Sequence, residues 1–142
     1  MFFGNHTYRI DQKGRLVIPP SFRGDLRAGI FLARGLDPCI DLCPRSLWDN
    51  LYQEYKAHPL APSRDRDLAL WAFGGAFPGE IDGQGRVLLP GSLREYGNIQ
   101  EEVVIVGIGS FIQLWNPQRW NNKEEDLRQR VWRLAEEKGE KR

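Results

Sequence analysis

The sequence of 142 residues has two cysteines, two histidines and no long apolar run. Two cysteines are too few for a disulfide framework, and no apolar run approaches the roughly 18–20 residues that a membrane-spanning helix needs. The opening residues, MFFGNHTYRID, have neither the basic start nor the apolar stretch of a secretory signal peptide. We therefore expect a cytoplasmic protein without a membrane partner.

The chain also lacks an excess of charge, because 20 basic residues face 19 acidic ones and leave a net charge of +1. This balance excludes a polycation that coats nucleic acid by total charge alone. Any nucleic-acid binding must come from a local basic surface. Hydrophobic residues make up 41% and charged residues 27% of the chain, as in ordinary globular domains.

What the sequence does contain is an internal duplication. The segment IDQKGRLVIP at 10–19 recurs as IDGQGRVLLP at 81–90, an offset of 71 residues. After one inserted residue the match resumes at offset 72, where Gly35, Ile40, Leu42 and Trp48 align with Gly107, Ile112, Leu114 and Trp120. Two copies are too few for a solenoid, which needs about three. We expect a pseudo-two-fold pair that closes on one core.

The pattern in each copy predicts a mainly β protein with peripheral helices (an α+β fold), in which two tandem copies of one small β-hairpin unit share a core. The expected strands cover 8–11, 15–18, 30–33, 39–43, 79–82, 86–89, 103–107 and 111–115. Helices are expected at 21–26, after Pro44, from a cap at Ser63 to Gly74, and from a cap at Asn116 to about Lys138.

These elements divide the chain into four parts. The proline-containing segment HPLAP at 58–62 is typical of a linker. We expect the first repeat at 1–57, a linker and helix at 58–75, the second repeat at 76–120, and a C-terminal helix and tail at 121–142.

The repeated block has the form D-x-x-G-R followed by three apolar residues and proline. Its aspartate is expected to accept backbone N–H groups of the turn, its glycine to allow the turn, and its arginine to project from one rim. Paired guanidinium groups suit phosphate contacts and bidentate recognition of guanine. These residues are Asp11, Gly14 and Arg15 in the first repeat and Asp82, Gly85 and Arg86 in the second. The same spacing also permits a purely structural ion pair that fixes the turn, with Arg23 and Arg94 on solvated helix faces.

The two copies differ in charge. Residues 1–34 carry six basic and two acidic residues, whereas residues 80–105 carry two basic and five acidic ones. Lys13 stands at the tip of the first turn, and its counterpart Gln84 is uncharged. The first copy is therefore the stronger candidate for a surface that faces a polyanion, with Lys13 and Arg9 as phosphate contacts.

Three other kinds of site fit the residues less well. The segment VVIVGIG at 103–109 begins like a dinucleotide-binding turn, but Ile112 stands where the fingerprint needs its third glycine. Cysteine and histidine are common metal ligands, so Cys39 and Cys43, together with His6 or His58, suggest a metal site. On a strand, however, the two cysteines would lie roughly 13 Å apart, which is too far for one zinc ion.

An acid/base dyad of Asp11 and Asp82 is the enzyme alternative. The arginine beside each aspartate lowers the pKa of its carboxyl and works against a shared proton. The hairpins also lack the Asp-Thr-Gly or Asp-Ser-Gly sequence of aspartic proteases, and the two histidines offer no credible catalytic triad. We therefore expect no enzymatic activity.

The sequence resembles the MraZ family of bacterial transcriptional regulators, which have two tandem SpoVT/AbrB-type domains. The resemblance rests on the duplicated block, the opening MFFGNHTYRIDQKGRLVIP, the central ALWAFGGA and the block DGQGRVLLP, and it covers Phe2 to about Trp132. It implies that each repeat is an AbrB-like hairpin unit and that the two units share one barrel.

The resemblance also implies a function. Family members bind direct repeats upstream of their own gene and of the cell-division and cell-wall gene cluster, and they assemble into ring-shaped homo-oligomers. The family's DNA-contacting motif, D-x-x-x-R, corresponds to Asp11 to Arg15 and Asp82 to Arg86. The expected partner is double-stranded DNA in the nucleoid, with no cofactor, metal or small-molecule substrate. The alternative is a ring-forming scaffold protein that does not bind DNA.

Overall fold

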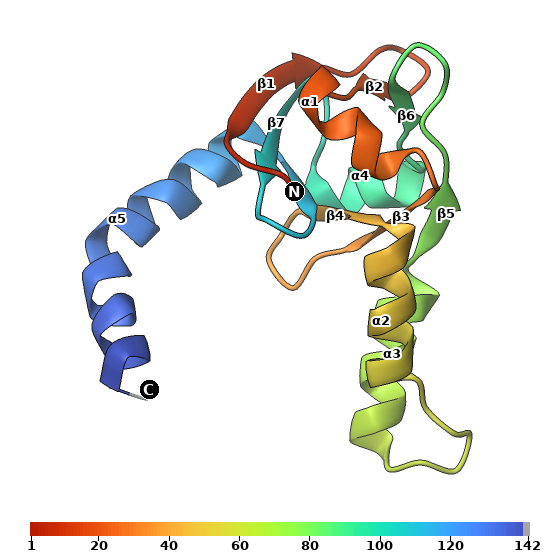
Figure 1. The fold of residues 1–142 in the computed structure, drawn as a ribbon, viewed down its shortest axis with the longest axis vertical. Coiled ribbons are helices and arrows are strands. Elements are labelled where there is room, and N and C mark those ends of the chain that lie inside the picture. Colours follow the sequence, from red (N-terminus) through yellow and green to blue (C-terminus); the bar gives the residue numbers. More distant parts are fainter. Residues whose placement is uncertain (141–142) are drawn as a thin grey trace.

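The computed structural model describes residues 1–140 and contains two antiparallel sheets with helices around them (Figure 1). The larger sheet has six strands in the order β1-β7-β8-β4-β3-β5, and β2 and β6 form a separate two-stranded ribbon. The strands of the larger sheet are β1 (Asn5–Arg9), β3 (Ile30–Arg34), β4 (Ile40–Pro44), β5 (Phe77–Gly79), β7 (Glu102–Gly107) and β8 (Ile112–Trp115). The ribbon consists of β2 (Arg15–Val17) and β6 (Arg86–Leu88).

The strand order interlocks the two repeats. Strand β1 of the first repeat pairs with β7 of the second, from Asn5 opposite Val106 to Arg9 opposite Glu102. In the same way β5 of the second repeat pairs with β3 of the first, and β4 and β8 join the halves in the middle of the sheet. The repeat counterpart of β1 is β5, that of β3 is β7 and that of β4 is β8. Exchanging these counterparts gives the same strand order read from the opposite edge of the sheet, as in a pseudo-two-fold pair.

The sheet is not closed into the barrel that the sequence predicted. Strands β1 and β5 lie at the two edges of the sheet and do not pair with each other. The chain leaves each edge strand through a turn and continues into the ribbon, where β2 and β6 pair with one another. Because the ribbon takes up these two strands, none remains to join β1 to β5. A single bridge between Ile10 and Leu16 connects the first edge with the ribbon.

The main core lies between the six-stranded sheet and the ribbon, with the short helices that follow the ribbon strands. Leu16 and Val87 are the inward-facing residues of the ribbon, and both are buried. They belong to one cluster with buried residues of the large sheet such as Leu32, Ile105 and Leu114. Full burial of a side chain of this size stabilises a fold by about 1.5–3 kcal/mol, so the cluster fixes the ribbon on the sheet.

The helices are placed around this core. They are α1 (Pro20–Arg23), the 3-10 turn η1 (Gly24–Leu26), α2 (Arg45–Tyr55), α3 (Ser63–Gly74), α4 (Gly91–Gly97) and α5 (Pro117–Glu140). Helices α2 and α3 lie side by side and project from the end of the molecule opposite the ribbon, while α5 extends away from the body (Figure 1). No helix within residues 1–140 is both long and apolar enough to cross a membrane.

Several local expectations are corrected. Strand β1 (Asn5–Arg9) starts and ends earlier than the expected strand at 8–11, and β5 (Phe77–Gly79) starts and ends earlier than the expected strand at 79–82. The reason is that the residues after Arg9 and Gly79 leave the sheet to form the turns. Ser63 does not cap α3; it is the first residue of the helix, after Pro62. Asn116 does cap α5, since its Oδ1 accepts the backbone N–H groups of Gln118 and Arg119. Residues 141–142 of the expected tail lie outside the described residues.

Candidate nucleic-acid interface

The first turn is built around the Asp11 carboxylate. Oδ1 of Asp11 accepts the backbone N–H groups of Lys13 and Arg15, both at 2.9 Å, and Oδ2 accepts Nε of Arg15 at 3.1 Å. Gly14, with φ of +81°, donates its N–H to the Asp11 carbonyl at 3.0 Å. The backbone N–H of Arg15 lowers the pKa of the Asp11 carboxyl and outweighs the opposing effect of desolvation. The Asp11 carboxylate therefore lies inside its own turn and accepts two of the turn's backbone N–H groups.

The second turn repeats this geometry. Oδ1 of Asp82 accepts the backbone N–H groups of Gln84 at 2.9 Å and of Arg86 at 2.8 Å, and Oδ2 accepts Nε of Arg86 at 2.9 Å. Gly85 has φ of +76°. The pKa of the Asp82 carboxyl is lowered, first by the backbone N–H of Arg86. Each aspartate is thus held as an anion in its own turn, which does not suit a proton shared between Asp11 and Asp82.

The two arginines after these turns project from the same face of the ribbon. In the antiparallel register Arg15 lies opposite Leu88, and Val17 lies opposite Arg86. Because side chains alternate along a strand, these four residues share the outer face, and the residue between them in each strand is buried. The aspartate of each turn accepts a hydrogen bond from Nε of its arginine, and this contact does not involve the two Nη atoms at the end of the guanidinium.

Each turn is also fixed to the other repeat. The backbone N–H of Ile18, after β2, donates to the carbonyl of Gly85 at 2.8 Å. The backbone N–H of Leu89, after β6, donates to the carbonyl of Gly14 at the same distance. The turn of one repeat is therefore held at the end of the other repeat's ribbon strand, and both arginines are placed by one hydrogen-bonded unit.

Two further arginines, Arg23 and Arg94, for which solvated helix faces were one of the alternatives, lie against the turns. Arg23 lies over Gly85, where an added Cβ would overlap its guanidinium, and its Nε donates to the Ile18 carbonyl at 2.9 Å. Arg94 lies over Gly14, where a Cβ would be 3.2 Å from its Cζ. Arg23 and Arg94 occupy equivalent positions in the two repeats. This recurrence is the sequence signal that could have identified both as part of the site. They add two cations beside the ribbon.

Comparison with known proteins identifies the family. The family model of the MraZ protein, described as antitoxin-like, matches residues 1–70 and 72–138. The chain belongs to the MraZ family. It is 38% identical over 122 residues to the transcriptional regulator MraZ of Roseiflexus sp. (strain RS-1), which covers 86% of this chain and 85% of that protein. A protein of the same name from Dehalococcoides mccartyi (strain ATCC BAA-2100 / JCM 16839 / KCTC 5957 / BAV1) is 34% identical over 137 residues, 96% of each chain.

The other two cationic residues predicted as DNA contacts in this MraZ family member, Lys13 and Arg9, lie in different parts of the structure. Lys13 is exposed at the tip of the first turn. Arg9 lies on β1 rather than on the ribbon, and its Nη2 is 4.0 Å from Oε1 of Glu102. Such an exposed pair is weak, so it leaves the Arg9 side chain able to move to a phosphate. Gln84 takes the place of Lys13 at the second tip.

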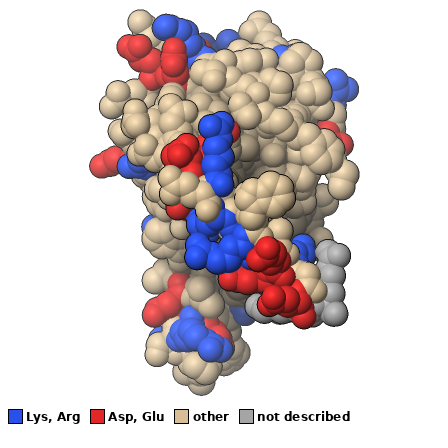
Figure 2. Space-filling view, turned by 90° about the vertical axis from the view of Figure 1, so that its left-hand side faces the viewer, with Lys and Arg blue, Asp and Glu red and all other residues tan. Residues whose placement is uncertain are grey.

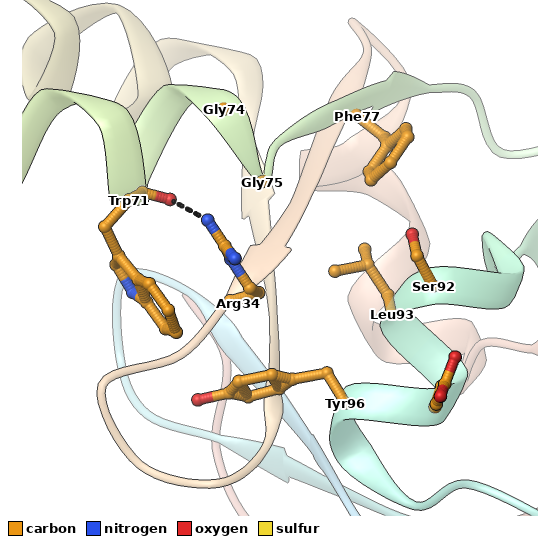
Figure 3. A pocket seen from close by; sticks show the side chains of 9 residues that line it. Arg34, Trp71, Gly74, Gly75, Phe77, Ser92, Leu93 and Tyr96 are labelled. Carbon is orange, nitrogen blue, oxygen red and sulfur yellow. Dashed lines mark hydrogen bonds between the residues drawn. The ribbon is translucent and has the colours of Figure 1, made fainter.

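Not every arginine of the first 34 residues adds to a basic surface. The Arg34 guanidinium lies over the Trp71 ring, 3.8 Å from its centroid, and its Nη2 donates to the Trp71 carbonyl at 3.0 Å. This contact lines a pocket of about 430 Å³ between α3 and α4, and Tyr96 closes one side of it (Figure 3). Arg34 therefore fastens α3 to the sheet, and the count of six basic residues overstates the charge available at the ribbon.

The side of the molecule that carries α5 is not uniformly basic. Figure 2 shows Lys and Arg side chains beside Asp and Glu on this face. Along α5, Arg128 pairs with Glu124 at 3.3 Å and Arg130 with Asp126 at 2.8 Å. Within each pair the two charges neutralise one another, so these arginines offer little attraction to phosphate.

The cysteines and the glycine-containing segment have structural surroundings. Cys39 and Cys43 are buried, and burial raises the pKa of both thiols, that of Cys43 to about 12. Among residues 1–140 no three His, Cys, Asp or Glu side chains gather in a way that fits a metal ion. The segment 103–109 forms β7 and leads into β8, where a dinucleotide site needs a helix.

Proposed function

We propose that this chain is a sequence-specific DNA-binding transcriptional regulator, not an enzyme, and that it binds double-stranded DNA through the β2–β6 ribbon. The observation that carries the proposal is the pair Arg15 and Arg86 on the outer face of one hydrogen-bonded ribbon, each oriented by an aspartate. The relatives named transcriptional regulator MraZ support the role.

The geometry fits the chemistry of base recognition. A two-stranded antiparallel ribbon is narrow enough to enter the major groove of B-DNA, where guanine presents two acceptors, O6 and N7. The Nε of Arg15 is held by Asp11, so its two Nη atoms form the fork for these acceptors. Asp11 itself is neutralised by Arg15 and by turn N–H groups, which reduces its repulsion of phosphate. Lys13 and Arg9 contact the backbone phosphates.

The family resemblance supplies the finer part of the proposal. Each repeat is a SpoVT/AbrB-type unit, and the DNA sites are direct repeats upstream of the protein's own gene and of the division and cell-wall gene cluster, within the nucleoid. The D-x-x-x-R motif in both copies supports this. One subunit offers few cations, so neighbouring subunits on adjacent repeats gain by effective concentration.

We also propose that the chain assembles with itself into a ring through α5. This helix buries none of its residues, and it exposes 80% of Trp132, 46% of Val131 and 40% of Leu134. Exposed apolar side chains on a projecting helix favour a protein partner, and a ring requires a head-to-tail contact between copies. Light scattering should show a lower mass for Trp132→Glu, and an unchanged mass would remove α5 from the interface.

The experiment for DNA binding is a gel-shift titration at fixed salt. The full chain is titrated against a duplex from upstream of its own gene and against a scrambled duplex. Arg15→Ala should weaken binding to the native duplex by about fivefold to 150-fold, the range for one bidentate contact to a base. Arg64→Ala, an exposed arginine on α3, is the matched control and should bind like the parent.

Each other result has a definite meaning. Unchanged affinity of Arg15→Ala would remove Arg15 from the site. Equal binding of native and scrambled duplexes would refute sequence-specific recognition. No binding by a folded, assembled protein would favour the scaffold alternative.

A further inference from the structure

The outer face of the ribbon also exposes two aliphatic side chains. Leu88 is 60% exposed and Val17 is 37% exposed. They occupy equivalent positions of the two repeats, two residues after Arg86 and Arg15. A single exposed aliphatic residue is ordinary, but here the same exposure recurs at both symmetric positions, on the face that carries the arginines.

The register places each aliphatic residue directly beside an arginine of the other repeat. Leu88 lies opposite Arg15, and Val17 lies opposite Arg86. Hydrogen bonds join the positions just beyond the ribbon, from Ile18 to Gly85 and from Leu89 to Gly14. Because hydrogen-bonded and non-hydrogen-bonded pairs alternate in an antiparallel ladder, the outer pairs are non-hydrogen-bonded, with opposite Cα atoms about 4.5 Å apart.

Each end of the ribbon therefore presents a guanidinium and an aliphatic group side by side. The core does not explain the aliphatic groups, since Leu16 and Val87 fill the inner face of the ribbon. In the major groove only thymine offers a methyl group, and proteins read it by apolar contact. Stacked base pairs lie about 3.4 Å apart, so opposite residues of the ribbon reach neighbouring base pairs.

We propose that Leu88 and Val17 are specificity-determining residues that contact thymine methyl groups next to the guanines bound by Arg15 and Arg86. This inference rests on the proposed DNA binding through the ribbon. Leu88 is longer and more exposed than Val17, so it makes the larger contribution. The preferred DNA site then has thymine at a base pair adjacent to each recognised guanine.

The test removes the methyl group and the leucine separately and together. The full chain first selects duplexes from a randomised pool, and each thymine of the selected site is then replaced by deoxyuridine. At one or more positions the parent protein should lose about fourfold in affinity, the factor for burying one methyl group. At one of these positions, the Leu88→Ala variant should have the same affinity for the duplex with thymine and the duplex with deoxyuridine. Leu60→Ala, whose side chain is 88% exposed in the linker, is the control and should keep the fourfold loss.

The outcomes separate this inference from the proposed function. Sequence-specific binding with no effect of deoxyuridine at any position would overturn the inference and leave the proposed function standing. The same fourfold loss in Leu88→Ala and in Val17→Ala would show that the methyl group is read elsewhere, and would also overturn it. A change of oligomeric mass in Leu88→Ala without a change in DNA affinity would assign this face to contacts between copies. No selection of any sequence would refute the proposed function itself.

Discussion

Alanine at the two turn glycines should cost different amounts of stability, although the two turns look alike. Gly14 has φ of +81° and Gly85 has φ of +76°. A residue with a Cβ in this left-handed region costs roughly 1–2 kcal/mol, so this cost is common to both variants. The difference comes from the arginine that lies over each glycine.

At Gly85 the new Cβ overlaps the Arg23 guanidinium, which must move and release its 2.9 Å bond to the Ile18 carbonyl. A hydrogen bond from a charged group contributes about 1.5–3 kcal/mol, and water replaces part of it because Arg23 is only partly buried. At Gly14 the Cβ would be 3.2 Å from Cζ of Arg94, whose Nε has no hydrogen-bond partner among the described residues. We expect a loss of about 1–2 kcal/mol for Gly14→Ala and about 2–4 kcal/mol for Gly85→Ala.

Urea unfolding of the full chain at one fixed protein concentration measures these free energies. Gly4→Ala is the matched control, because Gly4 has φ of +78° and nothing lies within 4 Å of an added Cβ. It should show the backbone cost alone and fall close to Gly14→Ala. A loss for Gly14→Ala equal to or larger than that for Gly85→Ala would refute the role of Arg23 at the second turn.

Two more predictions concern charge. Lys13→Gln should reduce the salt dependence of DNA affinity by about one phosphate contact and Gln84→Lys should increase it by a similar amount, in titrations at several salt concentrations; slopes that stay equal to the parent's would contradict phosphate contacts at the turn tips. Burial, with the nearby Asp37 charge, raises the pKa of Asp41 to about 7. The folded state therefore holds the proton more tightly than the unfolded state. The protonated Asp41 carboxyl therefore contributes at most about 4 kcal/mol to the free energy of unfolding. This contribution is complete below about pH 4 and is lost as the pH rises through about 7. Urea unfolding between pH 4 and 8 should show this loss in the parent and not in Asp41→Asn, and equal slopes for both would contradict it.

The geometry of the turns could be predicted because it is local. Asp11 and Asp82 accept N–H groups two and four residues further along the chain, and Gly14 takes a positive φ. All of these contacts lie within a five-residue motif. Their chemistry depends on the short side chain of aspartate and the missing Cβ of glycine, which are visible in the sequence.

What could not be predicted depends on contacts between distant parts of the chain. Nothing in residues 5–9 indicates that they pair with β7 of the other repeat, and the same apolar strands fit a closed barrel or an open sheet with a ribbon. Arg23 and Arg94 look like ordinary helix residues until the fold brings each to the other repeat's turn. Arg34 counts as a surface cation in the sequence, but it lies on Trp71.

The pairing of β1 with β7 has a consequence for synthesis of the protein on the ribosome. The first strand is made at once, but its partner strand ends at Gly107. At roughly 5–20 residues per second, β1 waits about 5–20 s for its neighbour to be translated. During this interval the first half holds an unpaired β1 and a β2 without β6. Nascent chains halted before β7 should therefore stay sensitive to protease and associate with chaperones, and folding should follow only after most of the chain has left the exit tunnel.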